Sequence, residues 1–78
     1  MLEEPKYIKR FRIVIAEVAD HEYSVCEIYY QLDKWAVIRQ ENVPVVQFFS
    51  PKSQEHWEFP LEIAIEVLQK AKAIFLTK

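Results

Sequence analysis

The spacing of hydrophobic residues in this 78-residue chain changes near Pro60. Before that proline, apolar residues occur in short and mostly alternating runs, which are typical of β-strands. After it, from Leu61 to Leu76, they recur at helical spacing, and no glycine or proline interrupts them. Several strands followed by one closing helix predict an α+β fold, in which an antiparallel meander of four or five strands packs against one C-terminal helix.

The length predicts a single domain over residues 1–78. Asp33-Lys34 is expected to form a tight hairpin turn, because aspartate tolerates left-handed backbone better than most residues. The run Val45–Phe49 is apolar except for Gln47, and it is expected to form a strand covered on both faces. The expected strands are Tyr7–Val18, Tyr23–Leu32, Trp35–Glu41 and Val45–Phe49, with His56–Phe59 as a candidate fifth strand at an edge.

Alternation divides the first two strands into two faces, because successive side chains of a strand point to opposite sides of the sheet. The first strand also carries a second face that begins polar and ends apolar, with Arg10, Arg12, Val14 and Ala16. The residues expected to face the core are Tyr7, Phe11, Ile13 and Ile15 in the first strand and Cys26, Ile28, Tyr30 and Leu32 in the second.

The composition excludes several classes of function. The chain has no glycine, which rules out the glycine-rich loops that bind phosphate in P-loop and dinucleotide-binding proteins. A net charge of −2 gives no indication of a polyanionic partner. Cys26 is the only cysteine, so no intrachain disulfide forms and a reducing compartment is expected. The acidic start and the lack of a long apolar run predict a cytoplasmic protein without signal peptide or membrane span.

The helix carries more apolar surface than an ordinary surface helix. Its apolar residues cover roughly 200° of its circumference, whereas a stripe of about 100° suffices to cover a core. Either a small sheet covers this whole face, or part of it packs on another subunit, because small domains often complete their core by oligomerisation. The residues predicted to contact a second copy or another protein are Ile63, Val67, Ala71 and Ile74 in the helix and Val14 and Ala16 on the second face of the first strand.

A second surface combines basic and aromatic residues near the N-terminus. Such a combination suits single-stranded nucleic acid, because the charges follow the backbone and the rings stack on bases. The alternative is a strand end guarded by charges against aggregation, and Glu17, Glu27 and Glu41 weaken the positive field that phosphate binding needs. The residues predicted for a nucleic-acid surface are Lys9, Arg10, Arg12, Trp35 and Arg39.

Catalytic and metal-binding residues are sparse. A structural zinc site usually needs four Cys or His ligands, but the chain holds only His21, His56 and Cys26, which lie far apart. Cys26 lies on the apolar face of a strand and is expected to be a small core residue. We therefore expect no metal, no cofactor and no enzymatic activity.

Two resemblances accompany this pattern. The segment Tyr29–Arg39, preceded by Tyr7-Ile8-Lys9, resembles small uncharacterised bacterial β-rich domains in which a strand ending in Leu-Asp turns into an aromatic-Glu-Val-Arg strand. Ala36 replaces the acidic residue of that motif, and the glycine of the family's third turn is missing. The resemblance implies an accessory or immunity-type binding protein. The order of strands and helix also resembles the layout of PC4-like single-stranded DNA-binding proteins, which dimerise through the helix.

The sequence thus predicts a small non-catalytic protein-interaction module, homodimeric, that occupies a surface of a protein partner. The alternative is a single-stranded nucleic-acid-binding protein that uses the basic and aromatic sheet face.

Overall fold

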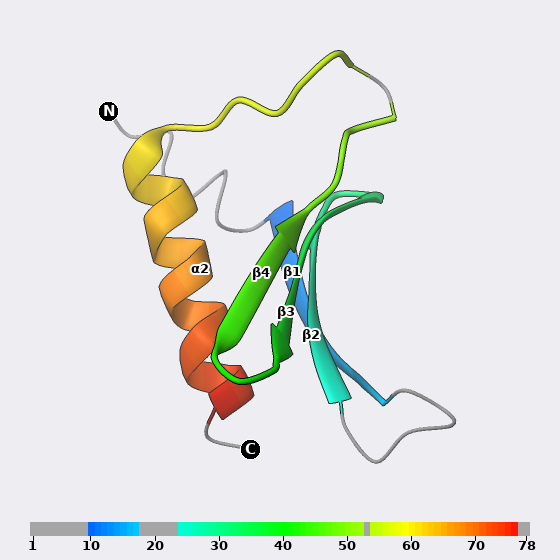
Figure 1. Ribbon diagram of the computed structural model, residues 1–78. Helices are drawn as coiled ribbons and strands as arrows, with labels where there is room; N and C mark the ends of the chain where they lie inside the picture. Colours follow the sequence, from blue (N-terminus) through cyan, green and yellow to red (C-terminus); the bar gives the residue numbers. More distant parts are fainter. Residues whose placement is uncertain (1–9, 18–23, 53, 77–78) are drawn as a thin grey trace.

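The computed structural model describes residues 10–17, 24–52 and 54–76. It shows a four-stranded antiparallel sheet in the order β1-β2-β3-β4 with one helix packed against it (Figure 1). This confirms the predicted α+β meander with a C-terminal helix. The elements are β1 (Phe11–Glu17), β2 (Ser24–Tyr30), β3 (Asp33–Gln40), β4 (Pro44–Phe48) and α2 (Leu61–Leu76).

The sheet has a helix-facing side and an open side, as the strand register shows. Ile13 lies opposite Ile28, which lies opposite Ala36, which lies opposite Phe48, so one row of apolar side chains crosses all four strands. This row belongs to the helix-facing side. The open side carries Arg12, Val14, Ala16, Val25, Glu27, Tyr29, Lys34, Val37, Arg39, Val45 and Gln47.

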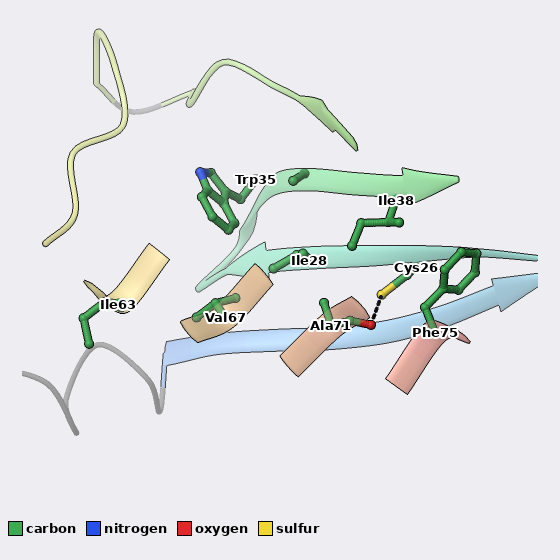
Figure 2. Close-up of a cluster of buried hydrophobic side chains, with 9 residues drawn as sticks. Cys26, Ile28, Trp35, Ile38, Ile63, Val67, Ala71 and Phe75 are labelled. Carbon is green, nitrogen blue, oxygen red and sulfur yellow. Dashed lines mark hydrogen bonds between the residues drawn. The ribbon is translucent and has the colours of Figure 1, made fainter. Parts of the chain in front are cut away.

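The core lies between the helix-facing side and one face of α2. Ile63, Val67, Ala71 and Phe75 recur every four residues, the spacing that stacks side chains on one helix face, and all four are buried. Figure 2 shows Val67, Ala71 and Phe75 beside the sheet residues Ile28 and Cys26, and Ile63 belongs to the same cluster of buried residues. The Cys26 thiol donates a weak hydrogen bond to the carbonyl oxygen of Ala71, with Sγ and O 3.9 Å apart. The small side chains of Cys26 and Ala71 let the helix backbone approach the sheet at this point.

The hairpin turn between β2 and β3 differs from the prediction. Tyr30 pairs with Asp33, so the two connecting residues are Gln31 and Leu32, while Asp33 and Lys34 belong to β3. Gln31 has a φ of 56° and takes the left-handed conformation that the sequence assigned to aspartate. The prediction that Leu32 faces the core is also wrong, because a turn residue leaves the sheet, and Leu32 is 90% exposed.

A β-bulge explains the irregular hydrophobic pattern of β3. The register with β2 shifts between Ile28, which pairs with Ala36, and Tyr29, which pairs with Lys34. Trp35 is therefore an extra residue without a partner on β2, and its side chain joins the core. Because a bulge shifts the alternation by one position, Trp35 and Ala36 both pack on the helix-facing side.

The segment between β4 and α2 forms no strand, which corrects the candidate strand at His56–Phe59. Trp57 Nε1 instead donates a hydrogen bond of 2.6 Å to the carbonyl oxygen of Phe49. The rings of Trp57 and Phe59 stack 5.7 Å apart and pack against the core. The two rings thus lie together in irregular backbone that crosses over the end of the sheet (Figure 1).

Helix α2 begins immediately after Pro60, with the bounds that the sequence predicts. The carbonyl oxygen of Pro60 accepts hydrogen bonds from the backbone N–H groups of Ile63 and Ala64. Pro60 therefore occupies the capping position, one residue before the position that proline favours. No helix in the described part of the chain is long and apolar enough to cross a membrane.

Candidate interaction surface

Three of the four helix residues predicted to contact a partner are enclosed within this chain. Ile63 is 1% exposed, and Val67 and Ala71 are likewise buried under the sheet. Because these side chains are not accessible, they cannot contact a second protein, and this part of the prediction is wrong. The physical reason is that β1 and β2 form the floor on which α2 packs, and their side chains cover the centre of the apolar arc. Ile74, at the margin of that arc, stays exposed.

Val14 and Ala16 lie on the open side of the sheet, as the alternation predicted. Both are half-buried, and the register places them in two adjacent rows that also hold Val25, Val37 and Val45. Glu27 and Arg39 lie in the same rows and interrupt the apolar residues, on a side that no described helix or strand covers. The structure does not bring Val14 and Ala16 together with Ile74, because the sheet lies between them.

Strand β4 is the part of the sheet that the helix leaves most exposed. The sequence predicted a strand covered on both faces, but β4 is the last strand of the meander and forms an edge. Its side chains on the helix-facing side extend beyond the shelter of α2, so that Val46 is 42% and Phe48 is 53% exposed. The apolar run reflects an uncovered edge strand, and the prediction is corrected.

The backbone of β4 presents unused hydrogen-bonding groups along this edge. The N–H of Phe49 donates to the carbonyl oxygen of Trp35 at 3.0 Å. In an antiparallel pair, alternate residues form the bonds to the neighbouring strand, so Gln47 also bonds to β3. Val46 and Phe48 therefore direct their N–H and C=O groups away from β3, and within the described residues these groups have no partner.

A shallow apolar groove lies beside this edge. It encloses about 190 Å3 between β4 and α2 and is lined by Ile38, Pro44, Val45, Val46, Leu68 and Lys72. Leu61 and Ile65 continue the same shoulder of the helix, because they precede Leu68 at the spacing of neighbouring turns. Both are exposed. The edge of β4, the groove and this shoulder together form one surface, which we call the β4 surface.

The β4 surface carries little charge. The sequence from Asn42 to Pro51 contains no Asp, Glu, Lys or Arg, and Lys72 is the only charged residue that lines the groove. Natural edge strands are often guarded by charged side chains or proline. Pro44 guards only the first residue of β4, so Val46 and Phe48 remain open to pairing.

The predicted nucleic-acid residues do not form one surface. Arg12 lies on the open side with its guanidinium 4.8 Å from the Tyr29 ring centroid, and Arg10 is exposed just before β1. Trp35 is buried on the opposite side, in the core, so it cannot stack on a base, and this part of the prediction is corrected. Lys9 lies outside the described residues.

The basic residues on the open side are partly neutralised. Arg39 lies on that side but bonds to Glu41 Oε2 at 3.2 Å and to Gln47 Oε1 at 2.6 Å. Lys34 Nζ lies 3.3 Å from Glu27 Oε2. Both ion pairs lower the positive potential that a phosphate backbone would meet.

The described residues hold no group of three or more His, Cys, Asp or Glu side chains that fits a metal ion. A hollow of about 560 Å3 lies beside the hairpin turn, and among the described residues that line it only Asp33 carries a carboxylate. Burial, and to a smaller extent the nearby charge of Glu27, raises the pKa of the Cys26 thiol. A raised pKa disfavours the nucleophilic thiolate, which agrees with a structural role for Cys26.

The sequence did not lead us to predict that Val46, Phe48 and the helix shoulder are exposed and form an interaction surface. A topological signal was present, because the last strand of a four-stranded meander must be an edge, and an uncharged apolar run at an edge indicates a binding surface.

Comparison of the chain with protein-family models, with curated proteins and with solved structures finds no match.

Proposed function

We propose that this protein is a small non-catalytic protein-interaction module that binds a protein partner through the β4 surface. The observation that carries the proposal is the pair of exposed apolar side chains on β4, Val46 and Phe48, beside a groove and beside backbone groups that have no partner among the described residues. Exposed apolar surface of this kind marks interaction sites in soluble proteins. Strand addition at a sheet edge supplies backbone hydrogen bonds, and adjacent apolar pockets supply specificity.

Single-stranded nucleic-acid binding receives less support. It needs aromatic rings that are accessible for stacking beside free positive charges. On the open side, Tyr29 lies between Arg12 and Lys34, but its hydroxyl donates a hydrogen bond to Glu27. The carboxylate of Glu27, in the next row of the sheet, opposes a phosphate backbone.

The proposal is tested by affinity capture with matched surface variants. Ile65→Lys places a charge on the helix shoulder of the β4 surface. Ile74→Lys places the same charge at another exposed isoleucine of α2, which does not line the groove. We expect proteins retained by the wild type and by Ile74→Lys to be lost from Ile65→Lys.

Far-ultraviolet circular dichroism and the urea midpoint of each variant verify that the fold is intact. Retention of the same proteins by both variants would contradict binding through the β4 surface. A wild type that retains no protein and does not self-associate would contradict an interaction function altogether.

A further inference from the structure

We infer that the partner of the β4 edge is a second copy of this chain, joined by antiparallel pairing of β4 with β4 about a two-fold axis. The inference rests on the proposed function and specifies its partner. It combines the direction of the free backbone groups, the absence of charge along the edge and the geometry that two-fold symmetry imposes.

The free backbone groups are self-complementary. Val46 and Phe48 each present one N–H and one C=O at the edge, as the hydrogen bonds of β4 to β3 imply. If Val46 of one copy lies opposite Phe48 of the other, both residues of both copies exchange these groups, and four hydrogen bonds form. Pro44 lacks an N–H, but it is not needed in this register, so the proline costs no bond.

The side chains fit the same register. Paired residues of neighbouring strands lie on the same side of a sheet, so each Val46 meets the partner's Phe48 on the helix-facing side. Pairs of aromatic and β-branched residues stabilise antiparallel sheets. On the open side, Gln47 meets its own copy at the two-fold axis; its Oε1 accepts a hydrogen bond from Arg39, whose charge is paired with Glu41, and its amide N–H groups can donate to the partner.

The absence of charge distinguishes a second copy from a different protein strand. Two-fold symmetry brings residues near the axis close to their own copies, so any charge there would face a like charge. The ten residues from Asn42 to Pro51 carry none. An edge evolved for a strand of different chemistry gains specificity from complementary charges, and β4 offers none.

Pairing about this axis also encloses the apolar groove. Both helices then lie on the same side of one continuous eight-stranded sheet, one on each flank of the two β4 strands. The exposed faces of Val46 and Phe48 and the two Leu68 shoulders line a single trough between the helices, which shields surface that each copy leaves open to water.

A cysteine at the axis tests the register. Gln47 and its copy form a non-hydrogen-bonded pair, in which Cα atoms lie about 4.5 Å apart, within the range of a disulfide. Under mild oxidation, we expect Gln47→Cys to form a covalent dimer and Gln69→Cys, on the exposed part of α2, to form none. Cys26 does not interfere, because it is fully buried. Cross-linking of Gln69→Cys with none of Gln47→Cys would overturn the inference.

Removal of an outward N–H tests the hydrogen bonds. Val46→Pro deletes a donor at the free edge and leaves the bonds from β4 to β3 in place. Native mass spectrometry and sedimentation are expected to show a dimer for the wild type and, for Val46→Pro, a dimer at least ten times weaker, since two bonds are lost per dimer. Circular dichroism of dilute samples verifies the fold of the variant.

A wild type that sediments as a monomer at tens of micromolar, or a dimer that Val46→Pro leaves unchanged, would overturn the inference. If Ile65→Lys nevertheless loses a bound protein that Ile74→Lys retains, the proposed function stands and only the identity of the partner is wrong. If neither self-association nor specific capture occurs, both proposals fall.

Discussion

At the scale of single residues, the hairpin turn shows how this chain manages without glycine. Gln31 adopts a φ of 56°, a region in which the side chain of an L-residue crowds the backbone, at a cost of roughly 1–2 kcal/mol. Its backbone N–H donates to the carbonyl oxygen of Arg10 at 2.9 Å. This bond ties the turn to the segment that precedes β1 and helps to offset the strain.

We predict that Gln31→Gly raises the free energy of unfolding by about 0.5–1 kcal/mol, because glycine takes positive φ without strain. Urea denaturation followed by tryptophan fluorescence measures the change. Leu32→Gly is the matched control, because Leu32 lies in the same turn, is exposed and has no positive φ. It should leave stability unchanged or lower it, and an equal gain from both variants would contradict the assigned strain.

Cys26 gives a pH-dependent prediction. Burial raises the pKa of its thiol, so the folded state disfavours the thiolate relative to the unfolded chain. The contribution of Cys26 is fully present below the ordinary thiol pKa of about 8.5. It is lost as the pH rises from there toward the raised pKa of the folded state, because the unfolded chain then releases the proton more readily.

Urea midpoints between pH 7 and pH 10 should therefore fall more steeply for the wild type than for Cys26→Ala, whose side chain cannot ionise. The comparison of slopes removes the contribution of tyrosines and lysines, which titrate in both proteins. Equal slopes would show that the thiol ionises as easily in the folded protein as in the unfolded chain.

At the scale of elements, helix α2 divides its apolar residues between core and surface. Ile63 and Ile65 are the same residue type in the first two turns, yet one is 1% and the other 38% exposed. Ile63→Ala should lower the free energy of unfolding by about 2–5 kcal/mol through a cavity in the core. Ile65→Ala should cost less than about 1 kcal/mol, partly because alanine favours the helix.

Chemical denaturation of the two alanine variants measures both losses on one helix. Similar losses would mean that the phase of the helix against the sheet is wrong. A large loss of stability for Ile65→Ala alone would place the helix shoulder in the core. The groove on which the proposed function depends would then not exist.

The elements also show which features can be predicted from sequence. The bounds of α2 and the core side of β1 follow from hydrophobic spacing, because one face of each element is buried against a single neighbour. The turn at Gln31 and Leu32 could not be found this way, because the tertiary pairing of Tyr30 with Asp33 overrides local turn preference. The bulge at Trp35 leaves no periodic signal, since it breaks the period itself.

The candidate surface was predicted least well. Helical spacing identifies an apolar arc but not how much of it a sheet covers, and α2 proves to lie mainly over β1 and β2. As a result, three helix residues that were predicted to contact a partner are enclosed, namely Ile63, Val67 and Ala71. Two residues of the strand that was predicted to be covered on both faces are exposed, namely Val46 and Phe48. Coverage depends on where the helix crosses the sheet, and that offset depends on side-chain volumes such as those of Cys26 and Ala71.

At the scale of the whole molecule, the described chain contains one core between one sheet and one helix. Both layers supply buried side chains, since Cys26, Ile28 and Ile38 come from the sheet and Ile63 and Val67 from the helix. A sheet without the helix would expose its entire apolar side, and an isolated 16-residue helix is marginal in water. Neither layer is expected to persist alone.

We therefore predict that helix and sheet unfold in one transition. Circular dichroism at 222 nm is dominated by α2. Tryptophan fluorescence instead reports on Trp35 in β3 and on Trp57 in the segment between β4 and α2. Because both depend on the same core, their urea midpoints should coincide, as in two-state unfolding of small domains. Ile63→Ala should shift both midpoints together. An earlier loss of the circular dichroism signal would show that α2 detaches from a sheet that remains folded, and that the sheet holds a second source of stability.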